Sequence, residues 1–218
     1  SMKLSTSLLA SLLLFFPFLS LAQNGSDAKS QEVLKSVSAK YKSFKSLKAS
    51  FTVTIESPGK AKEVQKGTLY IKGDKYRLEF AGQDVISDGK TRWTYVKDAN
   101  EIQIDNQRKD ENAITPTNIF TLYEKGWNSK YIGEAKEPSG PVHQIELVPI
   151  EPKKKNVFKV KIAVSKADKF IVSAKVFDKN GGFQTFQVDK LSPDILTDDT
   201  QFVYNATRYP GAEVVDLR

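Results

Sequence analysis

The 218-residue chain contains no cysteine and a single histidine, His143. The lack of thiols excludes disulfide bonds and a Cys–His catalytic pair, and one histidine cannot build a histidine-rich zinc site. A Ser–His–Asp triad would need His143, which lies in the alternating run Val142-His143-Gln144-Ile145 and is expected to be a satisfied strand residue. No glycine-rich phosphate loop follows a strand. We therefore expect a protein that is not an enzyme, with no cofactor and no metal site. Acidic pairs in polar loops, Asp110-Glu111 and Asp198-Asp199, leave a carboxylate-pair hydrolase as a minor alternative.

Long apolar runs are also lacking, with one exception from Leu8 to Leu19. This run follows a positively charged start and ends at Ser20-Leu21-Ala22, where small residues occupy positions −3 and −1. Residues 2–22 are therefore predicted to be a cleavable export signal, with Ser1 as a residue left over from cloning. The run is too short to span a bilayer. Gln23, and not a cysteine that could carry lipid, follows the cleavage site, so the mature chain is expected to be soluble outside the cytoplasm.

The charge and the length of the chain limit its possible partners and its number of domains. The chain has 33 basic and 26 acidic residues and a formal net charge of +7, which favours encounters with anionic surfaces or acidic partners. Nucleic acid is not an expected partner, because the charges are scattered along the sequence. The one basic run, Lys153-Lys154-Lys155, is typical of a solvated loop. No internal repeat or linker divides residues 23–218, so we expect one domain.

Hydrophobic periodicity predicts a mainly-β fold with two helices. Apolar residues three or four apart indicate an amphipathic helix from Ala28 to Phe44. From Leu47 onward the period changes to two, with turns at Gly73-Asp74, at Ser87–Lys90 and at Asp178–Gly182. We count ten or eleven short strands, the last at Phe202–Tyr204. A second helix is expected to begin at Thr115-Pro116 and to end at Gly126.

Aromatic residues are abundant, with 13 Phe, 8 Tyr and 2 Trp. Many of them occupy alternating strand positions, so one face of the sheet must pack against something. Two interpretations remain open from periodicity alone. The sheet and helices could form a filled hydrophobic core, or they could enclose an apolar cavity that holds a ligand.

Three segments resemble the LolA family of periplasmic lipoprotein carriers. They are Lys66–Lys72, Lys75–Phe80 and Val85–Tyr95, and the most specific part is the turn Ser87–Thr91 followed by Trp93-Thr94-Tyr95. Pro210–Asp216 near the end of the chain agrees as well. The resemblance extends over essentially the whole mature chain.

The resemblance implies an unclosed antiparallel β-barrel of about eleven strands whose mouth is covered by helices forming a lid. It implies a periplasmic, monomeric carrier that shields the acyl chains of triacylated lipoproteins in a hydrophobic cavity. Such a carrier accepts them from an inner-membrane ABC transporter and delivers them to an outer-membrane acceptor. An envelope-stress sensor, or another apolar-ligand or protein-binding module on the same scaffold, is the alternative. A lipid-anchored receptor is disfavoured by the missing cysteine.

The resemblance and the strand alternation together suggest site residues. Tyr76 stands where the family places an aromatic residue facing the cavity. Alternation adds further cavity candidates, with the inward parity left open: Phe51, Val53, Leu69, Ile71, Leu78, Trp93 and Tyr95. The lid candidates are Leu34, Val37, Tyr41, Phe44, Ile119, Phe120 and Leu122.

One departure from the family concerns how the lid is held. Many members carry Arg-Pro before the third strand, and that arginine is thought to hold the lid closed. Here the segment is Lys72-Gly73-Asp74, one residue shorter and without arginine. Arg77 lies nearby, but it belongs to the strand, so we do not expect it to replace the missing residue.

Overall fold

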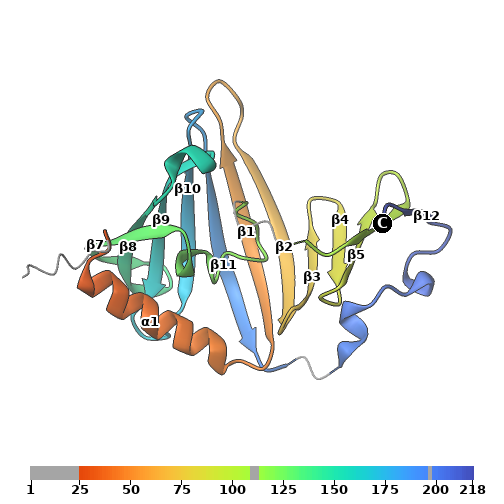
Figure 1. Ribbon diagram of the computed structural model, residues 1–218, viewed down its shortest axis with the longest axis horizontal. Helices are drawn as coiled ribbons and strands as arrows, with labels where there is room; N and C mark the ends of the chain where they lie inside the picture. Colours follow the sequence, from red (N-terminus) through yellow and green to blue (C-terminus); the bar gives the residue numbers. More distant parts are fainter. Residues whose placement is uncertain (1–24, 109–112, 196–197) are drawn as a thin grey trace, which may run out of the picture.

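A computed structural model describes residues 25–108, 113–195 and 198–218 (Figure 1). The predicted export signal, residues 2–22, and the acidic pair Asp110-Glu111 lie outside these residues. Within them, twelve strands form one sheet in the order β12-β6-β5-β4-β3-β2-β1-β11-β10-β9-β8-β7. The strands are β1 Leu47–Glu56, β2 Glu63–Lys72, β3 Lys75–Phe80, β4 Gln83–Ser87, β5 Thr91–Val96, β6 Glu101–Asn106, β7 Trp127–Glu137, β8 Gly140–Pro149, β9 Val157–Ser165, β10 Ile171–Asp178, β11 Phe183–Pro193 and β12 Glu213–Asp216.

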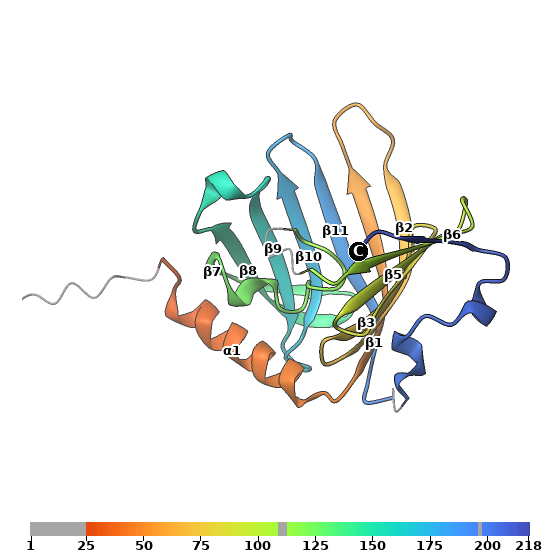
Figure 2. The same cartoon turned by 45° about the vertical axis from the view of Figure 1, so that its right-hand side comes forward.

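The sheet is strongly curved but does not close, because no ladder joins its end strands β7 and β12 in the described part of the chain (Figure 2). This confirms the expected half-barrel, with twelve strands where about eleven were expected. Two meanders compose it, β1 to β6 and β7 to β11. They meet where β1 pairs with β11, at a seam with a bulge between Ser50 and Phe51. The ladders are antiparallel except for β12, which pairs in parallel with β6.

The predicted hairpin turns are confirmed, and local hydrogen bonds explain them. In the turn between β4 and β5, the Asp88 carboxylate accepts hydrogen bonds from the backbone N–H groups of Lys90 (2.8 Å) and Thr91 (2.7 Å). Gly89 has a φ of 92°, which side chains disfavour. These bonds depress the pKa of Asp88 despite the opposing effect of burial. The turn therefore favours an ionised aspartate followed by glycine.

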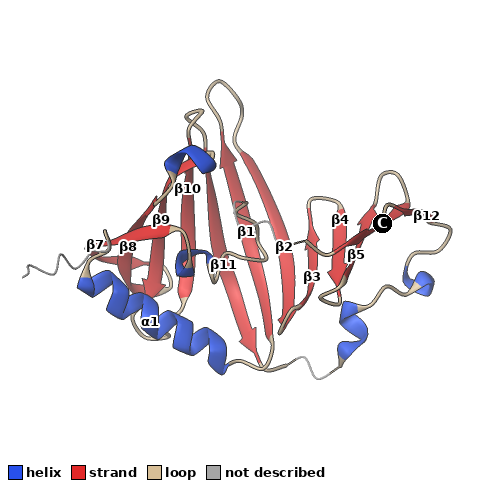
Figure 3. Ribbon diagram, in the orientation of Figure 1, coloured by secondary structure: helices blue, strands red, loops and turns tan. Residues whose placement is uncertain are grey.

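The helix α1, Ala28–Ser43, is the only α-helix among the described residues and agrees with the prediction to within one residue (Figure 3). Its apolar stripe buries Val33, Leu34 and Val37 against the concave face of the sheet. Its first turn is fastened to β7. The Ser30 hydroxyl lies 2.7 Å from the Ser129 hydroxyl, and the Asp27 carboxylate accepts from the N–H groups of Ser30 and Tyr131, both at 2.7 Å.

Replacing Asp27 with alanine should lower the free energy of unfolding by about 1–2 kcal/mol, because the helix loses its N-cap and a link to β7. Burial acts to raise the pKa of Asp27, but the hydrogen bonds from Ser30 and Tyr131 outweigh it and hold the pKa below its ordinary value. The contribution of the Asp27 carboxylate to the free energy of unfolding is therefore present at neutral pH and is lost as the pH falls below about 4. Urea denaturation at pH 7 and pH 3 tests this. Asp98→Ala, at an exposed turn, should have little effect; equal losses in both variants would contradict the capping role.

Two predicted elements are wrong. Residues 115–126 form successive turns and one short 3₁₀ helix, η1 (Leu122–Glu124), in place of an α-helix. Ile119, Phe120, Leu122 and Tyr123 are buried. The Asn118 side chain bonds to the backbone of Thr115 and Ala113, and such bonds favour turns over a helix. The predicted strand at Phe202–Tyr204 is instead the end of η3 (Asp199–Phe202), where the Asp198 carboxylate caps the turn. The remaining 3₁₀ turns are η2 Pro152–Lys154 and η4 Ala206–Arg208.

Candidate functional site

The pairing of the strands shows which of the alternating side chains on each strand face the interior. Residues directly paired across an antiparallel ladder project to the same face of a sheet. Leu69 pairs with Leu78 and Ile71 with Tyr76, and their partners on β1 continue the same face. Six predicted cavity residues lie together there: Phe51, Val53, Leu69 and Ile71 are buried, and Tyr76 and Leu78 pack against them.

Trp93 and Tyr95 lie on the opposite face, so their predicted place in the cavity is wrong. Trp93 pairs with Ile86, and Ile86 pairs with Arg77, whose side chain projects away from that of Tyr76. Both aromatic residues pack in a second cluster on the convex face with Ile86, Ile102 and Tyr209. The segment from η3 to β12 covers this cluster, which explains how apolar residues on the outer face become buried.

The seven predicted lid residues all join the interior cluster. Leu34 and Val37 of α1 are buried, with Tyr41 and Phe44 packed beside them. Ile119, Phe120 and Leu122 come from residues 113–126, which we call the lid segment, and all three are buried. α1 and the lid segment therefore cover the concave face from two directions (Figure 2).

An aromatic cluster joins the lid to the sheet, and Phe170 is at its centre. Its ring centroid lies 4.8 Å from that of Phe120, 5.6 Å from Phe44 and 6.3 Å from Tyr41. Phe170 is 2% exposed. The sequence interpretation placed Phe170 at the start of a strand but did not propose it as a site residue. Phe170 lies just before β10, so strand alternation does not show which face its side chain takes, and a contact with the lid could not be inferred.

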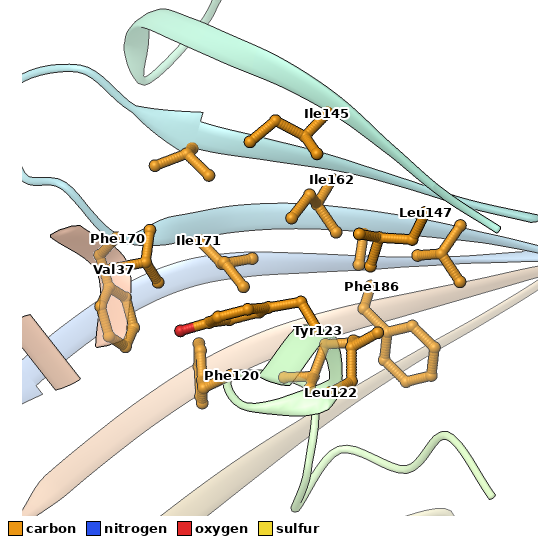
Figure 4. Packing of buried hydrophobic residues seen from close by; sticks show 14 of the residues in the cluster. Val37, Phe120, Leu122, Tyr123, Ile145, Leu147, Ile162, Phe170, Ile171 and Phe186 are labelled. Atoms are coloured by element: carbon orange, nitrogen blue, oxygen red, sulfur yellow. The ribbon is translucent and has the colours of Figure 1, made fainter. Parts of the chain in front are cut away.

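Other interior residues were also missed, mainly from β8 to β11. Figure 4 shows their side chains directed toward Phe120, Leu122 and Tyr123 of the lid segment. The buried members from these strands are Ile145, Leu147, Val160, Ile162, Val164, Ile171, Ala174, Val176 and Phe186. The alternation along β9 could have identified Val160, Ile162 and Val164 from the sequence.

The interior beneath Ile119 and Phe120 is filled by the protein's own side chains. The cavity left there is about 10 Å³ and is lined by residues of β1, β2, β10, β11 and the lid segment, including Ala49, Leu69, Ile119 and Phe120. That volume accommodates about one water molecule, whereas small-molecule sites typically measure about 300–1,000 Å³. This part of the interior is therefore closed, and a chain-like ligand has to displace side chains of the lid to enter it. A larger, open cleft of about 1020 Å³ lies beside the lid segment, and its lining includes Tyr41, Ile71, Tyr76, Arg92 and Leu122.

The lid segment is shaped by local hydrogen bonds and attached to α1 by a small polar contact. The Thr115 N–H donates to the Asn118 side chain (2.9 Å), which itself donates to the Ala113 carbonyl (2.7 Å). The hydroxyls of Ser38 and Tyr123 lie 2.9 Å apart, and Ser38 donates to Glu124 at 3.0 Å. Burial raises the pKa of Tyr123 to about 12, so its hydroxyl stays protonated at neutral pH.

Arg77 takes no part in holding the lid, in agreement with the expectation from sequence. It lies on the convex face, where its Nε donates to Glu79 (3.0 Å) and its Nη2 donates to the Tyr209 hydroxyl (3.3 Å). Tyr209 in turn donates to Asp84 (3.0 Å). The Lys72 side chain, from the segment that lacks arginine, pairs with Asp199 at 2.8 Å. In this chain the contact between α1 and the lid segment uses Ser38 instead.

His143 is satisfied, as expected: its Nδ1 lies 2.9 Å from the Tyr131 hydroxyl. Burial lowers its pKa. In the described ranges, no three histidine or acidic side chains come close enough together to hold a metal ion. Nor does any helix of that part of the chain have the length and hydropathy needed to cross a membrane.

A curved, unclosed sheet with an apolar concave face under a helix defines a half-barrel with a helical lid. The chain belongs to the family described as outer membrane lipoprotein carrier protein LolA, whose sequence model matches residues 42–205. No curated protein matches the chain.

Two solved structures illustrate the fold. An uncharacterized conserved protein from Thermus thermophilus is 18% identical with a TM-score of 0.59; the match covers 86% of this chain and 99% of that one. A chain in the MucA/MucB complex of Pseudomonas aeruginosa is 14% identical with a TM-score of 0.50. That match covers 82% of this chain and 62% of the other. At these identities the likeness establishes the fold alone.

Proposed function

We propose that this protein is a soluble periplasmic carrier that shields the acyl chains of triacylated lipoproteins, without catalysing a reaction. It would accept them from an inner-membrane ABC transporter and deliver them to an outer-membrane acceptor. The observation that carries the proposal is the apolar concave face, covered by a lid segment that adheres mainly through side-chain packing. The family match supports the cargo class.

The free energy of acyl-chain burial fits a carrier that must both bind and release its cargo. Each buried CH₂ group contributes about 0.8 kcal/mol, so exposed acyl chains strongly favour any apolar site. In the closed conformation the lid residues Ile119, Phe120 and Leu122 already occupy this site. An entering chain replaces their contacts with its own, so the net affinity is smaller than the burial alone would give. Release is therefore possible without a large input of energy.

Purification of the mature protein from its native periplasm, followed by mass spectrometry of retained molecules, tests the proposal directly. Triacylated lipoprotein should co-elute with the protein, and the protein should release lipoprotein from spheroplasts into the medium. Failure in both assays would disprove the carrier function. Recovery of a protein partner without lipid would favour the alternative module. The fold likeness to a chain of the MucA/MucB complex motivates that alternative.

Tyr76→Glu should weaken binding of a fluorescent long-chain acyl probe by tenfold or more, because it places a carboxylate on the concave face. Tyr76 packs on the interior cluster, and its hydroxyl donates to Gln107 at 3.0 Å. Tyr70→Glu is a matched control, because Tyr70 pairs with Arg77 on the convex face. The control should bind the probe like the wild type. Equal affinities for all three proteins would remove Tyr76 from the site.

A further inference from the structure

Lysines that are scattered in the sequence gather at one end of the fold. The β1–β2 turn, the β8–β9 connection with η2, and the β10–β11 turn all lie at the end away from α1 (Figures 1 and 2). Lys179 ties two of them together, since its N–H donates to the Asn156 carbonyl at 2.9 Å. Segments 56–63, 151–161 and 175–183 contain nine lysines and four acidic residues. This excess of five positive charges is most of the net charge of +7.

Three phenylalanines lie among these lysines on the convex face. The bulge that pairs Phe177 with Lys159 and Asp178 with Val157 leaves Phe158 unpaired and 6.0 Å from the Phe177 ring. The Phe183 ring lies 5.9 Å from Phe177 across the β10–β11 ladder. We call the following six residues the Lys–Phe surface: Phe158, Phe177, Phe183, Lys159, Lys161 and Lys175.

The lysines of the Lys–Phe surface lie over aromatic rings. The Lys175 Nζ is 3.9 Å from the Phe183 centroid, and the Lys159 Nζ is 5.0 Å from the Phe177 centroid. Two carboxylates border the Lys–Phe surface. Glu146 lies 4.0 Å from Lys159, and Glu56 pairs with Phe183 across the β1–β11 ladder. The positive charges therefore outnumber the negative ones and stay beside apolar groups.

Four exposed apolar residues lie at the same end. Phe158 is 44% exposed, and Val64, Val148 and Ile150 from neighbouring strand ends are 57%, 43% and 55% exposed. Aromatic and aliphatic side chains flanked by lysines are suited to the boundary between lipid headgroups and acyl chains. Anionic headgroups complement the excess of positive charge.

We propose that the Lys–Phe surface docks this protein on the surface of an anionic phospholipid bilayer. The lysines attract the headgroups, and Phe158 enters the interface. Because α1 lies at the opposite end of the molecule, it remains free of the bilayer in this orientation (Figure 1). The contact is peripheral and reversible, and it does not depend on acyl binding in the interior.

Sedimentation with vesicles tests the proposal. The wild-type protein should bind vesicles of phosphatidylglycerol and phosphatidylcholine and should not bind phosphatidylcholine alone. High salt should release it. The triple variant K159Q/K161Q/K175Q should lower the partition coefficient at least tenfold, because each lysine near an anionic surface contributes about a fivefold factor. Phe158→Ser should also weaken binding while leaving the salt dependence unchanged.

A second triple variant, K97Q/K136Q/K190Q, removes the same charge from exposed positions elsewhere. It should bind vesicles nearly as well as the wild type. Absence of vesicle binding by the wild type, or an equal loss in both triple variants, would overturn the proposal. So would a wild-type dimer that K159Q/K161Q/K175Q converts to a monomer, since the surface would then join two copies. Tyr76→Glu should keep its vesicle binding, and a loss there would mean that vesicles bind through the interior.

Discussion

Phe170→Ala should lower the free energy of unfolding by about 3–5 kcal/mol, the usual cost of truncating a buried phenylalanine. It should also raise the affinity for a long-chain acyl probe. Phe170 contacts Phe120 of the lid segment and the rings of Tyr41 and Phe44. Removing the ring weakens the closed conformation more than any open one, so a larger fraction of molecules is competent to bind. Urea denaturation and probe titration measure the two effects.

Phe202→Ala provides the matched control. Phe202 is fully buried, but it lies in η3 beside β3 and β4 and outside the interior cluster. Its loss should lower stability by a similar amount and leave probe affinity unchanged. If both variants gained affinity equally, the gain would come from general loosening, and the closing role of Phe170 would be wrong. If Phe170→Ala bound the probe less well than the wild type, Phe170 would be a ligand contact instead.

Arg77→Met should lower the free energy of unfolding by about 2–3 kcal/mol. Arg77 is 7% exposed and contacts Glu79, Asp84 and Tyr209 on the convex face. Breaking a fully buried ion pair costs about 3–5 kcal/mol. The loss here is smaller because the carboxylates are partly exposed and because the buried Arg77 Nη1 has no hydrogen-bond partner among the described residues. Removal of the charge should loosen the segment from η4 to β12, which hydrogen exchange can detect.

Arg92→Met tests whether burial of the arginine is the cause of the stability loss expected for Arg77→Met. Arg92 donates to Asp105 at 3.2 Å, but its side chain is 36% exposed, and it projects to the concave side. Exposed pairs of this kind contribute about 0–1 kcal/mol. A loss as large as that of Arg77→Met would show that arginine in this part of the sheet matters for reasons other than burial. Faster exchange at β12 in both variants would lead to the same conclusion.

The fold could be predicted well where local chemistry decides the structure. The turn at Ser87–Lys90 satisfies its own backbone through Asp88, and the α1 stripe repeats at helical spacing. Alternation alone does not indicate β4, because Val85 and Ile86 are adjacent apolar residues, which breaks the pattern expected of a strand. The lid segment was taken for a helix because its cap and its terminal glycine resemble helix signals. The structure has turns there instead, in which the Asn118 side chain bonds to the backbone of Thr115 and Ala113.

The site was predicted only as far as alternation allows. Alternation named Phe51, Leu69 and Ile71 as candidates with the inward parity left open, and it could not say that Trp93 and Tyr95 belong to the other face. Those two residues are covered by Tyr209, more than a hundred positions away in the sequence. No local pattern reports such a contact. The same limit applies to the Lys–Phe surface, whose lysines become neighbours only when β9 and β10 pair.

No ladder joins β7 to β12 in the part of the chain that the structure describes, and this has a mechanical consequence. In a closed barrel, strand number and stagger fix the radius, so the interior can expand only if hydrogen bonds break. This sheet has two free ends, and its radius of curvature can increase by small changes in twist spread over eleven ladders. The interior can thus widen while every ladder stays intact. For the proposed acyl-chain cargo, the elasticity of the open sheet would limit the bulk of the guest as much as the lid does.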